Sequence, residues 1–203
     1  MLGLTVGALL SRVLILVVAF TVHEFAHAWS ANELGDDTPR LNGRLTLNPL
    51  AHLDVVGSML LLLTGFGWAK PVPINPYALQ RRMRAGVMLV AGAGPFSNLI
   101  LAILAAIALR LGISQPLVSQ FLLQFIFINL VLLFFNMIPL FPLDGEKVLA
   151  YLLPPPGQDA MARIRPYGPM ILMGMIVVGS LGAIDIIGAL VTGPAMFMLS
   201  QLV

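Results

Sequence analysis

The feature that most constrains this chain is an apolar segment, residues 14–29, that carries ionisable groups within it. Its sequence is LILVVAFTVHEFAHAW, and His23, Glu24 and His27 all lie in its second half. Two histidines four residues apart lie on one face of a helix, one turn from each other, so both imidazoles can bind one metal ion. The carboxylate of Glu24 can then reach a water molecule on that ion. Ionisable groups are costly at membrane depth and usually functional there. We therefore predict a metal site. The simpler alternatives are that the motif is a chance match or that these side chains extend to the membrane surface.

The composition of the whole chain is that of an integral membrane protein. Hydrophobic residues make up 59% of its 203 residues, charged residues make up 10%, and the mean hydropathy is +0.95. This predicts a single membrane-embedded domain over residues 1–203, with its core at residues 4–153. The net charge is only +2, which argues against a nucleic-acid partner. Cysteine is absent, so nitrogen and oxygen atoms must hold any zinc.

The hydrophobic segments predict an all-α bundle of about four spanning helices in the lipid bilayer. The expected spans are residues 4–32, 86–109, 116–135 and a C-terminal helix at 167–191. Residues 50–66 are apolar but short. Residues 67–77, GWAKPVPINPY, combine three prolines with alternating Val and Ile, which predicts a small membrane-associated β-hairpin.

A site with two histidines needs at least one further protein ligand. Asp144 follows a hydrophobic span directly, and Pro139 and Pro142 break the helix just before it. A helix broken at membrane depth is tolerated where it is buried in protein or lines a water-filled cavity. This favours Asp144 as the ligand, whether or not its side chain also caps the short helix that follows. His52 and Asp185 are the alternatives.

Three motifs together resemble the site-2 proteases, which are intramembrane zinc metalloproteases. They are HEFAH, AGPFSN and NMIPLFPLDG, and the resemblance covers about residues 18–150. LNGRLTLNPLAHLDVVG and GWAKPVPINP resemble the compact bacterial branch, without a PDZ or nucleotide-sensing domain. The resemblance implies one Zn²⁺ per chain, with His23, His27 and Asp144 as ligands and Glu24 as the catalytic carboxylate. It also implies that Asn98 and Asn136 help to hold the substrate.

Several of these polar residues have simpler interpretations. Asn98 and Asn136 could instead form hydrogen bonds between helices, as Asn often does in membranes. His52 and Asp54 could support the ligands from behind or gate the cavity, or they could be ordinary polar residues at a turn. Residues 67–77 could offer an edge for an unwound substrate segment, or could simply join two spans.

A shared site also predicts the topology. The HEFAH motif lies in the C-terminal half of its helix and Asp144 follows the C-terminal end of span 116–135, so these two helices must run parallel. Because span 86–109 is already one crossing between them, residues 50–66 should be re-entrant or interfacial. Nine of the eleven Lys and Arg residues then fall on the side of the active site: Arg40, Arg44, Lys70, Arg81, Arg82, Arg84, Lys147, Arg163 and Arg165. By the positive-inside rule, the site opens toward the cytoplasm from the cytoplasmic membrane.

These features predict a zinc-dependent metalloendopeptidase that cleaves transmembrane protein substrates within or near their membrane segments, as in regulated intramembrane proteolysis. Glu24 would take a proton from the attacking water and deliver it to the leaving amine. A membrane transporter or metal-handling protein is one alternative, but the sequence has no internal repeat. A catalytically inactive scaffold is another, but such a protein would be expected to lose Glu24 or a ligand.

Overall fold

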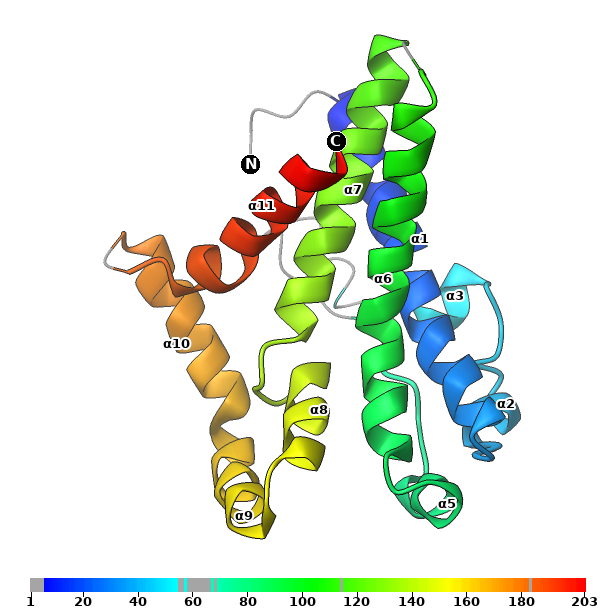
Figure 1. The fold of residues 1–203 in the computed structure, drawn as a ribbon, viewed down its shortest axis with the longest axis vertical. Coiled ribbons are helices and arrows are strands. Elements are labelled where there is room, and N and C mark those ends of the chain that lie inside the picture. Colours follow the sequence, from blue (N-terminus) through cyan, green and yellow to red (C-terminus); the bar gives the residue numbers. More distant parts are fainter. Residues whose placement is uncertain (1–5, 55–56, 58–66, 68, 114, 183) are drawn as a thin grey trace.

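Three long apolar helices form the centre of the fold. The computed structural model describes residues 6–54, 57, 67, 69–113, 115–182 and 184–203. Its long helices are α1 (Val6–Glu33), α6 (Gly86–Arg110) and α7 (Pro116–Asn136), and each is long and apolar enough to cross a membrane. Figure 1 shows that α1 and α7 run in the same direction and that α6 runs in the opposite direction, as a site shared by α1 and the end of α7 requires.

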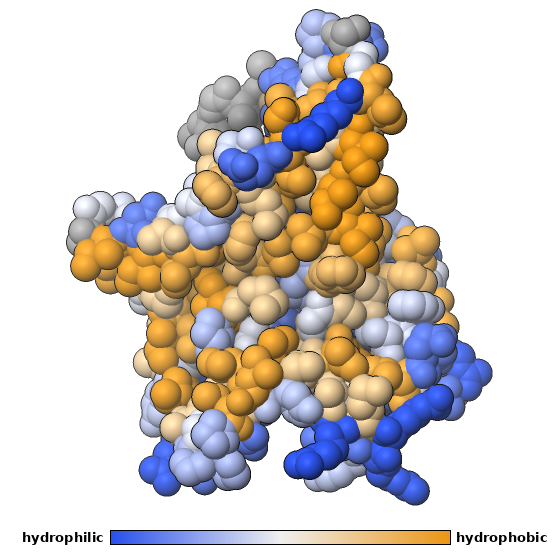
Figure 2. Space-filling view, in the orientation of Figure 1, coloured by the Kyte–Doolittle hydropathy of each residue, from blue (hydrophilic) through white to orange (hydrophobic). Residues whose placement is uncertain are grey.

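Shorter helices surround this centre. On the side where α1 ends lie α2 (Thr38–Leu41), α3 (Pro49–His52) and α5 (Pro76–Arg82). After α7 come α8 (Asp144–Leu152), α9 (Pro155–Ile164), the 3₁₀ turn η1 (Arg165–Tyr167), α10 (Gly168–Ser180), the π-helical turn η2 (Gly188–Thr192) and α11 (Gly193–Leu202). Apolar side chains cover the middle of the molecule, and hydrophilic ones gather at the end that carries α2, α5 and α9 (Figure 2).

Small residues allow the central helices to pack closely. Ala102, Ala105 and Ala106 of α6 are buried against Ile126 and Leu130 of α7, and Ala195 of α11 completes the cluster. Alanines at helix contacts let the backbones approach, which favours association in lipid, where the hydrophobic effect does not drive it. The core therefore holds α6 and α7 in register beside the residues of the site.

The predicted β-hairpin at residues 67–77 is not confirmed. The described residues of this segment form no strand, and their one β-bridge is antiparallel, between Leu53 and Ala69. Pro71 and Pro73 cannot donate backbone hydrogen bonds to a ladder. The side chain of Asn75 accepts from the backbone N–H groups of the next residues and so starts α5. Residues 70–75 therefore form neither helix nor strand, and their backbone bonds go to side chains such as Arg44 and Asp36 instead of a neighbouring strand.

The prediction of one continuous C-terminal helix over residues 167–191 is wrong. Helix α10 ends at Ser180, Gly182 follows with a φ of +74°, and Asp185 accepts a hydrogen bond of 2.6 Å from the N–H of Gly188 as the next helical segment begins. The 13 residues of α10 extend about 20 Å, less than the hydrocarbon thickness of a bilayer. The fourth span is therefore not confirmed. Most of residues 50–66 lie outside the described residues, so their re-entrant path stays a prediction.

Candidate metal centre and active site

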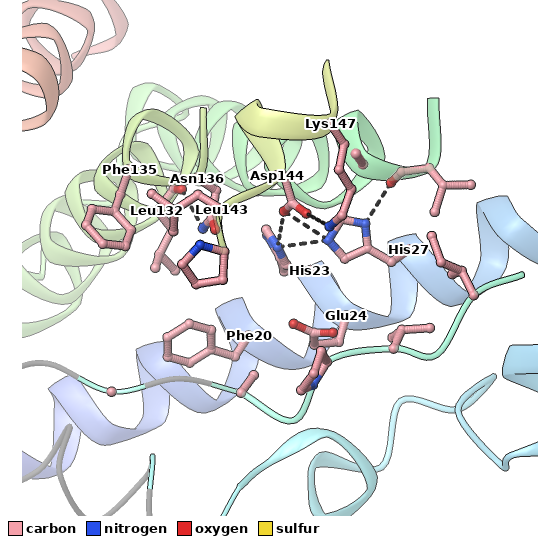
Figure 3. A pocket seen from close by; sticks show the side chains of 18 residues that line it. Phe20, His23, Glu24, His27, Leu132, Phe135, Asn136, Leu143, Asp144 and Lys147 are labelled. Carbon is pink, nitrogen blue, oxygen red and sulfur yellow. Dashed lines mark hydrogen bonds and ion pairs between the residues drawn. The ribbon is translucent and has the colours of Figure 1, made fainter. Parts of the chain in front are cut away.

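Three ligand atoms from two distant segments meet at one point. The Nε2 atoms of His23 and His27 lie 3.1 Å apart, and Oδ2 of Asp144 lies 3.2 Å from the first and 3.1 Å from the second. All three side chains are buried, and Figure 3 shows them converging from α1 and from the start of α8. Among the described residues, this is the one group of at least three His, Asp or Glu side chains that could hold a metal ion.

Hydrogen bonds on the far side of each imidazole determine which nitrogen faces this point. His23 Nδ1 lies 2.7 Å from Oδ1 of Asn98, and His27 Nδ1 lies 2.7 Å from the backbone carbonyl of Val90. A carbonyl oxygen only accepts, so each Nδ1 carries the proton and each neutral Nε2 presents a lone pair. Two lone pairs and a carboxylate oxygen at these distances repel each other unless a cation lies between them.

The spacing of the three atoms fits zinc. Tetrahedral zinc with ligands at about 2.0–2.1 Å places neighbouring ligand atoms about 3.3 Å apart, close to the 3.1–3.2 Å observed. Two imidazoles and one carboxylate also form the donor set of a catalytic zinc site, which keeps its fourth position open. His23, His27 and Asp144 are therefore a possible zinc site.

Helix α6 approaches the imidazoles closely because residue 94 is glycine. A Cβ atom at Gly94 would lie 2.6 Å from Nε2 of His23 and would overlap Nε2 of His27. Pro95 interrupts the hydrogen-bond ladder of the same helix, in the stretch whose Val90 carbonyl receives the His27 bond. In the sequence, the AGPFSN motif is only a mark of family resemblance, and nothing in it indicates that Gly94 leaves room for the two imidazoles.

A second close approach brings Asp144 to the site. A Cβ atom at Gly145 would lie 2.6 Å from the carbonyl oxygen of Ile138 and would overlap that of Met137, so α8 can begin against the end of α7 only with glycine here. The side chain of Asp144 makes no capping bond, and Nζ of Lys147 lies 3.4 Å from its Oδ1.

Glu24 lies in the same cavity as the ligands without being one of the three converging groups. The cavity has a volume of about 340 Å³, and it is lined by Glu24, the three ligand residues and mostly apolar side chains. Figure 3 shows the Glu24 carboxylate facing the space beside His23 and Asp144. The guanidinium of Arg44 is 4.0 Å from it. A buried carboxylate that faces open space beside a metal site is placed to exchange protons with a molecule bound there.

The two predicted substrate-binding asparagines occupy different positions. Asn136 lines the cavity, and its Nδ2 donates to the carbonyl of Leu132 at 3.0 Å. Asn98 is fully buried and is not among the residues that line the cavity. It bonds His23 instead, and so contacts a ligand rather than the space a substrate would occupy.

Arg44 and His52 lie behind one wall of the cavity. The guanidinium of Arg44 donates to the carbonyl of Pro71 at 3.0 Å and to that of Lys70, and it lies 3.4 Å from Nδ1 of His52. Nε2 of His52 bonds the carbonyl of Thr46 at 2.7 Å, so both ring nitrogens are engaged away from the metal ligands. We call the extended segment 69–75 the cavity wall, because Ala69, Pro71, Val72 and Ile74 all line the cavity.

Asp54, which the sequence suggested as a gate or support, and Asp36 both take local roles. Asp54 accepts from the N–H of Gly57 at 2.8 Å, and Asp36 holds the far end of the cavity wall by accepting from Asn75 N–H at 2.6 Å. In the sequence, Arg44 is only one of nine basic residues expected on the side of the active site. Its burial, with 4% of its surface exposed, comes from backbone carbonyls that fold around it, and no local pattern signals that.

The chain is similar to curated proteins over most of its length. It is 42% identical to "Putative zinc metalloprotease YwhC" of Bacillus subtilis (strain 168) over 174 residues, which are 81% of this chain and 79% of that protein. It is 31% identical to "Putative zinc metalloprotease Rip2" of Mycolicibacterium smegmatis over 183 residues, which are 83% of this chain and 69% of that protein. No family model matches the chain, and no solved structure matches it significantly. The chain is a membrane protein that belongs to the zinc metalloprotease family of these relatives.

Proposed function

We propose that this chain is an intramembrane protease of the site-2 type, which hydrolyses peptide bonds within or near the transmembrane segments of protein substrates. The observation that carries the proposal is the convergence of His23, His27 and Asp144 at 3.1–3.2 Å beside Glu24, inside a helix bundle apolar enough to lie in a membrane. In a soluble protein the same four residues would indicate a zinc peptidase of the HExxH type. The position of His23, Glu24 and His27 along α1 supports the intramembrane assignment.

The depth of the site follows from the length of α1. Glu24 lies nine residues before the end of this helix at Glu33, which corresponds to about 14 Å along its axis. The hydrocarbon layer of a bilayer is about 30 Å thick. Glu24 therefore lies well inside the membrane if α1 spans it. The many Lys and Arg residues after the C-terminal end of α1 support an opening toward the cytoplasm.

The three ligand residues, Glu24 and Asn136 each have a role in peptide hydrolysis. Zinc at the three ligand atoms would supply Lewis-acid chemistry, acidifying a water molecule and polarising a carbonyl. Glu24 accepts the proton of the attacking water and returns it to the leaving amine. Asn136 lines the cavity and can offer its amide to the substrate backbone, and the apolar side chains that form most of the lining exclude bulk water from the reacting bond.

The cavity wall supports a substrate in extended form. A transmembrane helix protects its peptide bonds in its own hydrogen bonds, so it must unwind before hydrolysis. The wall is itself extended and presents the apolar side chains of Val72 and Ile74 to the cavity. An unwound segment that lies along it would carry its peptide carbonyls past Glu24.

The direct test is cleavage by the purified protein. In proteoliposomes with a single-pass model substrate, we expect cleavage that falls by at least about hundredfold when a chelator removes the metal and that returns with added Zn²⁺. Substrate fragments would be measured by mass spectrometry. Zinc flux across the same vesicles without any fragments would contradict the proposal and indicate a metal transporter.

Arg44 should matter for cleavage but not for zinc. Arg44→Gln removes the donors to the carbonyls of Lys70 and Pro71 and frees the cavity wall, so we expect cleavage to slow by about tenfold while the zinc content stays unchanged. Arg40→Gln is the matched control, because Arg40 is exposed and its side chain pairs, within the described part of the chain, only with the exposed Asp37. Cleavage rates, zinc content and melting temperatures would be compared. Equal rates in the two variants would show that Arg44 does not hold the wall.

A further inference from the structure

A buried hydrogen-bond chain connects one metal ligand to the third membrane helix. His23 of α1 bonds Oδ1 of Asn98 of α6 at 2.7 Å, and Nδ2 of Asn98 donates to Oδ1 of Asn129 of α7 at 2.9 Å. Both asparagine side chains are fully buried. The chain thus passes through α1, α6 and α7, which lie side by side in Figure 1.

The direction of every bond in this chain follows from its last member. Nδ2 of Asn129 lies 2.9 Å from the backbone carbonyl of Phe125, which can only accept. The Oδ1 of Asn129 must therefore face Asn98, and the Nδ2 of Asn98 must donate a hydrogen bond to it. The Oδ1 of Asn98 then faces His23 and can only accept from it. That leaves the proton on Nδ1 of His23 and the lone pair of Nε2 toward the metal point.

Without Asn129, the amide of Asn98 would lose the bond that most strongly fixes its orientation. Its Nδ2 would keep only the contact of 3.4 Å to the carbonyl of Ala19. A flipped amide would point its N–H groups at Nδ1 of His23 and favour the tautomer with the proton on Nε2, which cannot bind a metal. In a dry interior the free-energy difference between the two orientations of the Asn98 amide is larger than in water, because an unpaired polar group has no alternative partner.

We propose that Asn129 is a positioning residue for the metal site: it fixes the amide orientation of Asn98 and thereby the nitrogen that His23 presents. This inference rests on the proposed zinc site and adds to it a residue that touches neither metal nor cavity. The packing of α6 against α7 does not need the hydrogen bond between Asn98 and Asn129, because Ala102, Ala105 and Leu130 already hold these helices together.

The test measures zinc affinity of the full chain in detergent by chelator competition. Asn129→Leu removes the acceptor, and we expect zinc to bind about tenfold more weakly. This is the lower end of the loss of metal affinity seen when hydrogen-bond partners of metal-bound histidines are mutated. Asn129→Asp should stay near the wild-type affinity, since a buried, protonated carboxyl can accept from Asn98 and donate to the Phe125 carbonyl as the amide does. Nitrogen-15 NMR of the His23 ring should show the Nδ1–H form in the wild type and in Asn129→Asp.

Leu130→Ala is the matched control. It removes a fully buried side chain from the next position of the same helix without touching the chain of hydrogen bonds, so zinc affinity should stay at the wild-type value while the protein loses stability. Equal losses of affinity in Asn129→Leu and Leu130→Ala would overturn the inference, as would wild-type affinity in Asn129→Leu or a weakened site in Asn129→Asp. Failure of the wild type itself to bind zinc would instead refute the proposed function.

Discussion

Replacing Glu24 by Gln is expected to abolish peptide hydrolysis while the zinc site stays intact. Gln has nearly the shape of Glu but cannot take a proton from water, and Glu24 is not one of the three converging ligand groups. General-base catalysis contributes about 10²- to 10⁴-fold, so cleavage should fall by that factor. Single-turnover cleavage of the model substrate and zinc content by elemental analysis would be measured on the same preparation.

Glu33→Gln is the matched control for this experiment. It makes the same change at the exposed end of the same helix, outside the cavity, and should cleave at the wild-type rate. Cleavage by Glu24→Gln at the control's rate would refute the role given to this carboxylate. Loss of zinc from Glu24→Gln would show instead that Glu24 takes part in holding the metal.

The second large effect is expected from a single added methyl group at Gly94. The Cβ of Ala would stand 2.6 Å from Nε2 of His23, closer than such atoms approach each other in proteins. The imidazoles cannot simply move away, since Asn98 and Val90 hold them by their Nδ1 atoms. We expect Gly94→Ala to weaken zinc binding by about hundredfold and to remove cleavage with it. Chelator competition and the cleavage assay would measure the two effects.

Gly92 offers a close control two residues earlier in α6. A Cβ atom at Gly92 meets nothing within 4 Å, so Gly92→Ala has the same gain in helix propensity without the collision. This variant should bind zinc and cleave as the wild type does. If Gly94→Ala behaved in the same way, the close approach of α6 to the ligands would have no functional meaning.

Those parts of the fold that local signals determine could be predicted from the sequence. Hydrophobic length gave the three long helices within a residue or two of their observed ends, because a membrane span must be long and apolar. Helical spacing alone places His23 and His27 on one face. Asp144 was found through the prolines before it, which break a helix where no lipid-exposed break is tolerated.

Features that depend on packing could not be predicted. Gly94 and Asn129 act through what lies across a helix contact, and nothing in their own sequence neighbourhood describes that neighbour. Residues 167–191 are mostly apolar, so hydropathy suggested one helix where the chain turns at Gly182. The alternation of Val and Ile in residues 67–77 suggested a hairpin, but the prolines remove the donors that a ladder would need.

His27 and Asp144 of the possible zinc site are 117 positions apart in the chain, and this separation has a consequence for biosynthesis. While a ribosome is still making the polypeptide, the histidine pair emerges early but has neither its carboxylate partner nor α6 to orient it. The proposed hydrolytic site therefore cannot be complete until α8 has left the ribosome and docked against the earlier helices. Because α8 follows all three long helices in the chain, the site forms only after these helices have been made.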